Sequence, residues 1–273
     1  MENITSLNSP HIERVKALIG SRGKKNRELE NTFVAEGIQV VREALSSKMA
    51  EGLAVKKVYV TEDGLKKLSE DIGAEALSKF EIIEVSDQVM NAMADSESPQ
   101  GILALCSTKS LKMSDLWQMK PKRIAFFWQI QDPGNAGAVI RTADAFGFNA
   151  IVFSDQCVDV YSPKVVRATA GSLWHIPVFE DVAISELKEL AQKNGIEIFG
   201  TDGNSDIALP DALLKLNKKP SIWVFGNEAR GLPSEVSADL NLVTIPMEGR
   251  AESLNLAVAA TVVMYEVSQA TKL

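Results

Sequence analysis

The stretch Arg123–Gly147, RIAFFWQIQDPGNAGAVIRTADAFG, decides the fold class. The apolar run at its start predicts a buried strand, and the glycine-bearing segment Gln131–Gly137 predicts a loop. The remainder, AVIRTADAFG, has the pattern of a helix with Gly147 at its C-cap. A buried strand that leads through a loop into a helix begins a parallel βαβ unit, so we predict an α/β fold with a parallel sheet.

The alternation of strand and helix extends in both directions from this stretch. Toward the C-terminus we predict strands at 150–155, 196–202, 221–226 and 242–247 and helices at 162–171, 184–195 and 253–270. Toward the N-terminus we predict a helix at 9–20 and strands at 32–37, 55–61, 80–85 and 101–107. The pattern therefore predicts two α/β domains, a small one at residues 1–107 and a larger one at residues 123–273.

Residues 108–122 lose this alternation. The segment carries several lysines and ends near Pro121, so we predict a linker. An amphipathic connecting helix built on Leu111, Leu116 and Trp117 is the alternative.

Composition narrows the class of protein. The chain has 273 residues, a net charge of −7 and a pI near 5.1, which argues against a basic coat but leaves local basic patches open. Two cysteines (Cys106, Cys157) and two histidines (His11, His175) are too few for a disulfide framework or a Cys/His metal site, so no metal is expected. No export signal or membrane-length apolar run is visible, and we expect a cytoplasmic protein without membrane contact.

Three loops that follow predicted strands combine glycine with short polar and charged residues: Gln131–Gly137, Gly226–Pro233 and Ile245–Asn255. Ligands bind at the carboxyl ends of strands in parallel α/β sheets, and glycine lets a backbone approach a ligand closely. Each loop alone is equally well explained as a turn with a helix cap. The phosphate-loop motif and the serine-hydrolase elbow are absent, and neither half has a dinucleotide fingerprint after its first strand.

Together and in order, these loops resemble the three motifs of the SpoU/TrmH family of RNA ribose methyltransferases. DPGNAGAVIRTADAFG (132–147) matches the family pattern D-P-x-N-x-G-x-x-x-R-x-A-x-A-x-G. FGNEARGL (225–232) matches F-G-x-E-x-x-G-L, and IPMEGRAESLN (245–255) matches I-P-M-x-G-x-x-x-S-L-N. The N-terminal segments SLNSPHIERVKAL, FVAEG and SPQGILAL resemble the RNA substrate-binding domain that many members carry.

The resemblance implies a fold, a cofactor and a reaction. The C-terminal domain is expected to form a deep trefoil knot, to bind S-adenosylmethionine and to work as a homodimer with its sites at the subunit interface. Gly226, Ile245 and Leu254 are expected to contact the cofactor, with Thr201 beside it. The implied reaction is methyl transfer to a ribose 2′-OH of RNA, and the N-terminal domain favours 23S ribosomal RNA as the substrate.

The resemblance also assigns roles to five polar residues. Arg141 matches the arginine that the family uses in catalysis, and because a guanidinium hardly deprotonates we interpret it as a phosphate clamp that aligns the 2′-OH. Glu228 is a candidate for orienting Arg141 or steering a proton, with a helix N-terminal charge as its alternative. Asn135 and Asn255 are expected to hold loops and orient the ribose, and Ser253 has either a functional role or that of an N-cap.

RNA binding by an acidic chain requires a local cationic patch. The segment Arg14–Arg27 has six basic residues and no Asp or Glu, and SRGKKNR within it is predicted as an exposed loop. We expect the RNA backbone to contact Arg22, Lys24, Lys25 and Arg27. Lys164, Arg167, Arg230 and Arg250 could extend this surface, and a solvated loop balanced by nearby glutamates is the alternative.

Two other functions compete with an rRNA 2′-O-methyltransferase. A tRNA 2′-O-methyltransferase would share the motifs, but small relatives that act on tRNA often lack the N-terminal domain. A non-catalytic RNA-binding or assembly factor would need a damaged site, whereas Asn135, Arg141 and Glu228 are present. The sequence therefore favours an enzyme.

Overall fold

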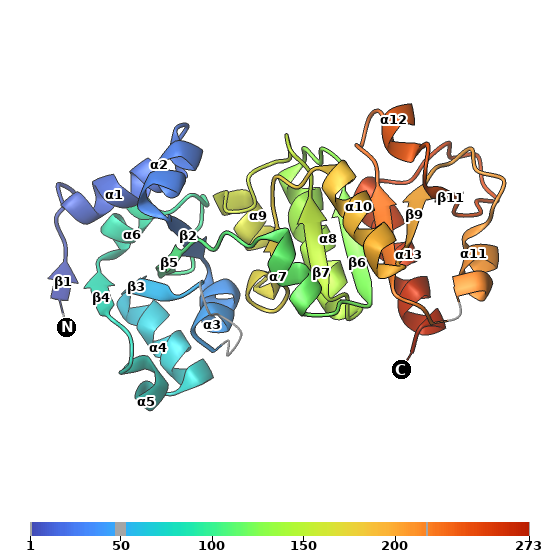
Figure 1. Ribbon diagram of the computed structural model, residues 1–273. Helices are drawn as coiled ribbons and strands as arrows, with labels where there is room; N and C mark the ends of the chain where they lie inside the picture. Colours follow the sequence, from blue (N-terminus) through green and yellow to red (C-terminus); the bar gives the residue numbers. More distant parts are fainter. Residues whose placement is uncertain (1, 47–52, 217, 273) are drawn as a thin grey trace. The chain divides into compact units, whose positions relative to one another are not determined.

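The computed structural model describes residues 2–46, 53–216 and 218–272, which form two compact units (Figure 1). The first unit comprises Met1–Lys109 together with Asp159–His175. The second comprises Ser110–Val158 together with Ile176–Leu273. None of the helices in the described ranges is long and apolar enough to cross a membrane.

The first unit is built on a five-stranded mixed sheet of order β1-β4-β3-β5-β2. Strand β5 runs antiparallel to both of its neighbours, and the other pairs are parallel. The strands are β1 (Glu2–Ile4), β2 (Thr32–Glu36), β3 (Val55–Val60), β4 (Ile82–Val85) and β5 (Ile102–Ser107). The helices are α1 (Pro10–Ile19), α2 (Gly23–Glu30), α3 (Ile38–Ser46), α4 (Glu62–Ile72), α5 (Ala74–Leu77), α6 (Asp87–Met93) and α9 (Pro163–Ala168), with a 3₁₀ turn η1 (Ser172–Trp174).

Helix α1 shows how the sequence pattern positions this unit. The Ser9 side chain accepts a hydrogen bond from the backbone N–H of His11, and Pro10 occupies the first turn, where its missing N–H costs nothing. Its apolar residues Ile12, Val15 and Leu18 are buried in one cluster with β3 and β4. The predicted helix at 9–20 is therefore confirmed.

Residues 159–175 return the chain to the first unit, which the domain boundaries predicted from the sequence do not include. Asp159 accepts hydrogen bonds from the Arg27 guanidinium, the Nε bond being 3.2 Å long. The rings of Tyr161 and Trp174 lie 4.8 and 5.8 Å from that of Phe33. A buried ion pair and an aromatic cluster thus hold this segment against β2 and its surroundings.

The second unit is a six-stranded sheet of order β11-β9-β10-β6-β7-β8 in which every pair is parallel, as the sequence predicted. Its strands are β6 (Arg123–Phe127), β7 (Ala150–Phe153), β8 (Val178–Phe179), β9 (Glu197–Thr201), β10 (Ser221–Phe225) and β11 (Asn241–Val243). Its helices are α7 (Met113–Gln118), α8 (Pro133–Ala145), α10 (Ile184–Asn194), α11 (Leu209–Leu216), α12 (Ser234–Ser237) and α13 (Leu256–Ala270). The trefoil knot stays a prediction.

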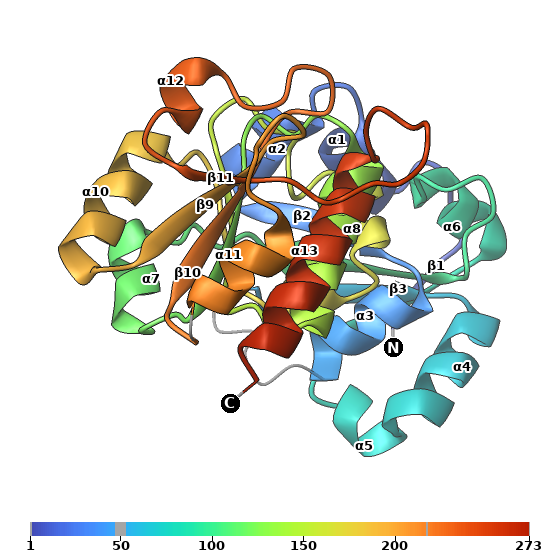
Figure 2. The same ribbon diagram turned by 90° about the vertical axis from the view of Figure 1, so that its right-hand side faces the viewer.

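Side chains alternate between the two faces of this sheet. Ile124, Phe126 and Val224 point to the layer of α7 and α10 and share a core with Leu116 and Leu187. The buried Met113 and Leu116 of α7 belong to this core, so the connecting-helix alternative describes the segment 108–122 better than a linker. Helices α8 and α13 lie side by side over the opposite face (Figure 2).

Candidate active site

A cavity of about 330 Å³ opens at the carboxyl ends of β9, β10 and β11. The four residues expected to contact the cofactor, Thr201, Gly226, Ile245 and Leu254, all line it. Glu228 and Ser253 line it as well. The second and third motif loops therefore meet in one cavity, because the carboxyl ends of parallel strands share one edge of the sheet.

Gly226 occupies a position where a side chain has no room. A Cβ there would lie 2.3 Å from the carbonyl carbon of Gly231 and 2.6 Å from the backbone nitrogen of Leu232. This close approach permits two backbone hydrogen bonds, from Asn227 to the Gly231 carbonyl (3.0 Å) and from Gly231 to the Asn227 carbonyl (2.9 Å). The glycine is thus explained by a tight loop that forms one wall of the cavity.

Asn227, which the sequence reasoning did not single out, organises this loop. Its Oδ1 accepts from the backbone N–H groups of Ala229 (3.0 Å) and Arg230 (3.3 Å), and its Nδ2 donates to the Gln129 carbonyl (2.7 Å). The side chain therefore closes its own loop and ties that loop to the end of β6. An asparagine directly after a glycine was its only signal in the sequence.

The first motif loop is shorter than predicted, because α8 begins at Pro133. Asp132 caps the helix by accepting from the backbone N–H of Asn135 (2.8 Å). The Gly134–Gly137 segment that was predicted as loop is therefore the first turn of α8.

Glu228 contacts the start of α8 and not Arg141. Its carboxylate accepts from the backbone N–H groups of Gln131 (3.3 Å) and Asp132 (3.2 Å) and from the side-chain amide of Asn135 (3.3 Å). A carboxylate at a helix N-terminus complements the helix dipole, which was the alternative interpretation of this residue. Within one chain Glu228 therefore positions the first motif loop, and its role toward Arg141 stays a prediction.

Asn255 links the third motif to the first. Its Oδ1 accepts from the N–H groups of Ala257 (2.9 Å) and Val258 (3.3 Å), which makes it the N-cap of α13, and its Nδ2 donates to Oδ1 of Asn135 (3.1 Å). The N-cap role considered for Ser253 thus belongs to Asn255, because α13 begins at Leu256.

Cys157 does not line this cavity. Burial raises the pKa of the Cys157 thiol, which is a weak nucleophile at neutral pH for that reason. In the part of the chain that the structure describes, no three His, Cys, Asp or Glu side chains gather as a metal site requires. The cavity instead offers backbone groups, short polar side chains and an apolar wall.

Comparison with family models identifies this arrangement. Residues 122–265, which hold all three motif loops, match the model of the SpoU rRNA Methylase family, and residues 11–104 match that of the MRM3-like substrate binding domain. The chain belongs to the SpoU rRNA methylase family. It is an S-adenosylmethionine-dependent RNA 2′-O-methyltransferase.

Relatives of this SpoU methylase match it over nearly its whole length. The 23S rRNA (guanosine(2553)-2′-O)-methyltransferase RlmP of Bacillus subtilis is 31% identical over 98% of this chain and 99% of its own. The 23S rRNA (uridine(2479)-2′-O)-methyltransferase of Streptomyces viridochromogenes is 30% identical over 96% of this chain and 90% of its own. The crystal structure of an AdoMet-bound rRNA methyltransferase from Sinorhizobium meliloti superposes with a TM-score of 0.80, at 25% identity, covering 98% of this chain and 97% of that one.

The cavity of the SpoU methylase fits S-adenosylmethionine. Its volume is in the range of small-molecule sites, and the side chains of Ile245 and Leu254 give it apolar surface. The absence of a side chain at Gly226 leaves backbone at the wall, where N–H and C=O groups can meet the cofactor's polar edges. Thr201 is held beside the cavity by a hydrogen bond from its hydroxyl to the Val224 carbonyl (3.3 Å).

Arg141 lies apart from this cavity. It is exposed on α8, six residues beyond Asn135, which corresponds to about 9 Å along the helix. No hydrogen bond or ion pair joins it to another residue of the described ranges, and it does not line the cavity of its own chain. The guanidinium is therefore free to bind a ligand or to reach another subunit.

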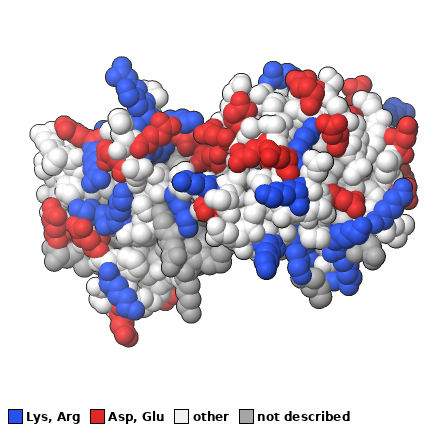
Figure 3. All heavy atoms as spheres, viewed as in Figure 1, with Lys and Arg blue, Asp and Glu red and all other residues white. Residues whose placement is uncertain are grey.

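The expected RNA-binding segment is partly helical, which corrects its prediction as a loop. Helix α2 begins at Gly23. Figure 3 shows Lys and Arg side chains at the surface in the region that α2 occupies in Figure 1. Lys24 and Lys25 are exposed and Arg22 precedes the helix, so these three can contact RNA. Arg27 is only 6% exposed because it pairs with Asp159 and donates to the Leu18 carbonyl, so a role for it in binding RNA is not supported.

Proposed function

We propose that this methyltransferase acts on a ribose 2′-OH of 23S ribosomal RNA in the cytoplasm. The observation that carries the proposal is that relatives named as 23S rRNA methyltransferases match this chain over nearly its whole length. The match includes both the methylase region and the substrate-binding domain. Those two relatives modify different nucleotides, a guanosine and a uridine. The choice of nucleotide is therefore a property of RNA recognition and not of the shared cofactor cavity.

We propose further that the enzyme is a homodimer whose interface includes α13 beside α8. Val258 and Tyr265 lie seven residues apart on one face of α13 and are 50% and 47% exposed. Two large apolar side chains on one face of a helix are typical of an interface. In a twofold dimer through this face, Arg141 of one subunit would serve the cavity of the other.

The roles of the chain's own groups follow from this arrangement. S-adenosylmethionine supplies an electrophilic methyl group on its sulfonium. Arg141 binds the phosphate next to the target ribose and so holds the 2′-OH in line, which is the larger part of catalysis when the electrophile is already activated. Glu228, Asn135 and Asn255 keep the three loops in register.

Transfer of a tritiated methyl group tests the substrate. The enzyme is incubated with labelled S-adenosylmethionine and with 23S rRNA or total tRNA, and the modified nucleoside is analysed for 2′-O-methylation. We expect label in 23S rRNA alone. Label only in tRNA would refute the rRNA target, and label in neither, with assembled ribosomal subunits also inert, would refute the enzyme function.

Mixing two inactive variants tests the dimer. Arg141→Ala removes the phosphate-binding guanidinium from one subunit. Gly226→Trp blocks the cofactor cavity of the other subunit. If Arg141 serves the partner's cavity, a mixed dimer regains one intact site and part of the wild-type activity. No recovery after subunit exchange would contradict the shared site.

A further inference from the structure

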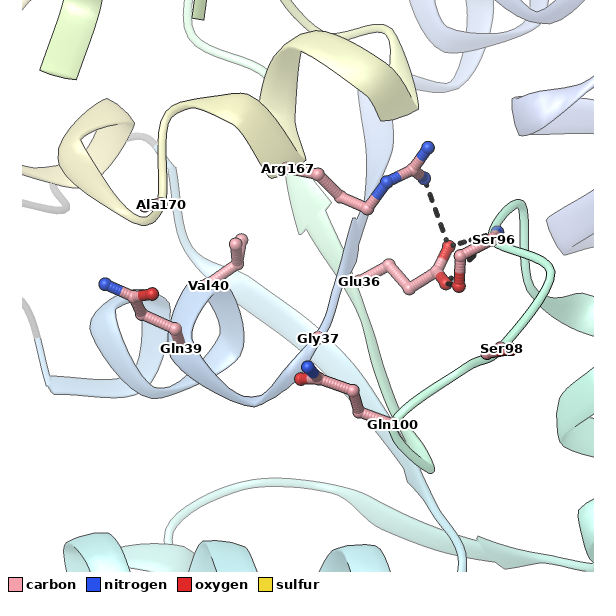
Figure 4. Close-up of a pocket in the computed structure, with 9 residues that line it drawn as sticks. All are labelled: Glu36, Gly37, Gln39, Val40, Ser96, Ser98, Gln100, Arg167 and Ala170. Carbon is pink, nitrogen blue, oxygen red and sulfur yellow. Dashed lines mark hydrogen bonds and ion pairs between the residues drawn. The ribbon is translucent and has the colours of Figure 1, made fainter. Parts of the chain in front are cut away.

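A second cavity, of about 240 Å³, lies wholly within the first unit and far in sequence from the motif loops. It is bordered by the first turn of α3, the loop 95–100 and α9 (Figure 4). Its wall contains Ala170 and the buried Val40, and polar residues make up most of the remaining lining. Nothing in the cofactor chemistry uses this cavity.

The Arg167 guanidinium is fixed at the edge of this cavity. Its Nη1 donates to Glu36 (3.3 Å) and its Nη2 to Asp95 (2.7 Å). Glu36 is 3% exposed, and its carboxylate also accepts from the N–H groups of Asp95 (2.9 Å) and Ser96 (3.2 Å) and from the Ser96 hydroxyl. Because the acceptor positions of Glu36 are occupied, it positions Arg167 and is not itself available to a ligand.

Three polar side chains around the cavity have hydrogen-bonding capacity left. Gln100 uses its Oε1 to accept from the backbone N–H of Ile38 (2.9 Å), which leaves its Nε2 group unused. The amide of Gln39 and the hydroxyl of Ser98 have no hydrogen-bond partner in the described ranges, and both residues are exposed. The cavity thus combines an apolar wall, a fixed planar cation and free amide and hydroxyl groups.

The charge balance selects the class of ligand. Arg167 is already matched by two carboxylates, so the cluster carries a net negative charge and does not favour a phosphate. A neutral flat group with hydrogen-bonding edges fits better. The plane of a guanidinium stacks on aromatic rings, and side-chain amides form hydrogen bonds with the edges of such a ring. The cavity holds the liquid volume of roughly eight waters at ~30 Å³ each, which suits one heterocyclic base.

We propose that this cavity binds one unstacked nucleobase of the RNA substrate. The inference deepens the proposed function and rests on it, because it assumes that RNA is the substrate. It places base recognition in the first unit at Arg167, Gln39, Ser98 and Gln100, whereas the lysines of α2 contact phosphates. RNA loops and bulges supply such bases without the cost of opening a helix.

The test combines a protein variant with RNA that lacks single bases. Ser98→Trp places a large side chain at the cavity from an exposed residue without structural partners. Ser78→Trp, at the exposed end of α5, is the control and removes one local hydrogen bond, from the Ser78 hydroxyl to the Glu75 carbonyl (2.7 Å). The RNA is the shortest 23S rRNA fragment that the wild-type enzyme methylates. Affinity is measured by filter binding for the intact fragment and for a series with one abasic nucleotide each, and S-adenosylhomocysteine affinity is measured as a folding control.

We expect Ser98→Trp to weaken binding of intact RNA about tenfold while Ser78→Trp and cofactor affinity stay within twofold of wild type. One abasic position should weaken wild-type binding by a similar factor and have no further effect on Ser98→Trp. Equal losses for both proteins at every position, or normal RNA affinity of Ser98→Trp, would overturn the proposal. Loss at a neutral methylphosphonate linkage instead of an abasic position would assign the cavity to phosphate and overturn it too.

The wild-type enzyme separates this inference from the proposed function. If it methylates no 23S rRNA fragment, the proposed function fails and the base-binding cavity falls with it. If it methylates a fragment that Ser98→Trp binds equally well, only the cavity is wrongly assigned.

Discussion

Replacing Gly226 by alanine introduces a single methyl group against backbone on three sides. Its Cβ would lie 2.3 Å from the carbonyl carbon of Gly231, 2.7 Å from the oxygen of that carbonyl and 2.6 Å from the nitrogen of Leu232. Ordinary contacts begin at 3.4 Å, so the loop has to open by about 1 Å. No flexible side chain is available to absorb this movement.

Opening the loop breaks the two backbone hydrogen bonds between Asn227 and Gly231. At about 1 kcal/mol each, their loss costs about 2 kcal/mol, before any remaining strain. For a unit of this size that corresponds to a fall in Tm of about 4–8 °C. If the same energy is needed to restore the wall of the cavity on binding, affinity for the cofactor falls about thirtyfold.

Calorimetric titration with S-adenosylhomocysteine measures this loss directly. The matched control is Gly249→Ala in the third motif loop, where an added Cβ has no atom within 4 Å and should leave affinity within twofold. Gly226→Ala binding within twofold of wild type would refute the reasoning. Equal weakening by Gly249→Ala would show that any alanine in these loops is harmful and that the backbone contact is not the cause.

Four further outcomes follow from other residues. Arg141→Ala should abolish methyl transfer and leave S-adenosylhomocysteine affinity within a few-fold, since the side chain lies outside the cavity; preserved turnover would contradict its role. Arg27→Ala should destabilise the protein by about 3–5 kcal/mol in urea unfolding, because it breaks a buried ion pair. Lys24→Ala and Lys25→Ala should leave stability unchanged but each lower the salt dependence of RNA binding by about one ion. Burial raises the pKa of Tyr59 from 10.0 to about 12. The stability of the wild type relative to Tyr59→Phe should therefore be constant below pH 10 and fall by up to ~3 kcal/mol as the pH rises from 10 to 12. Urea titrations of both proteins at each pH would measure this difference.

The sequence predicted five of the six strands of the second unit. Apolar runs that alternate with amphipathic stretches predicted the parallel sheet, and its topology then placed the loops that begin at Gly226 and Ile245 at one edge. Thr201 was predicted from the family resemblance and lines the same cavity. Helix starts were less well predicted, because Asp132 and Asn255 act as caps at positions that were placed inside loops or helices. Strands of two or three residues, β8 and β1, are too short to show a pattern and were missed.

Long-range pairing was beyond the sequence. Arg27 looks like its basic neighbours in a local window, and only its partner Asp159, far along the chain, makes it a buried structural residue. The same holds for Arg167, which was grouped with the loops of the second unit but pairs with Glu36 of the first. A local run of charged residues predicts that their side chains are exposed. Which acidic residue pairs with a given arginine depends on the fold.

The side-chain network gives a physical reason for the joint presence of the three motifs. Glu228 of the second motif holds the start of α8, Asn135 of the first motif contacts Glu228, and Asn255 of the third motif contacts Asn135 while it caps α13. A change in any one of these residues leaves a donor or an acceptor of another loop without its partner. The loops that wall the cofactor cavity and the two helices proposed to form the dimer interface are therefore fixed by the same few hydrogen bonds.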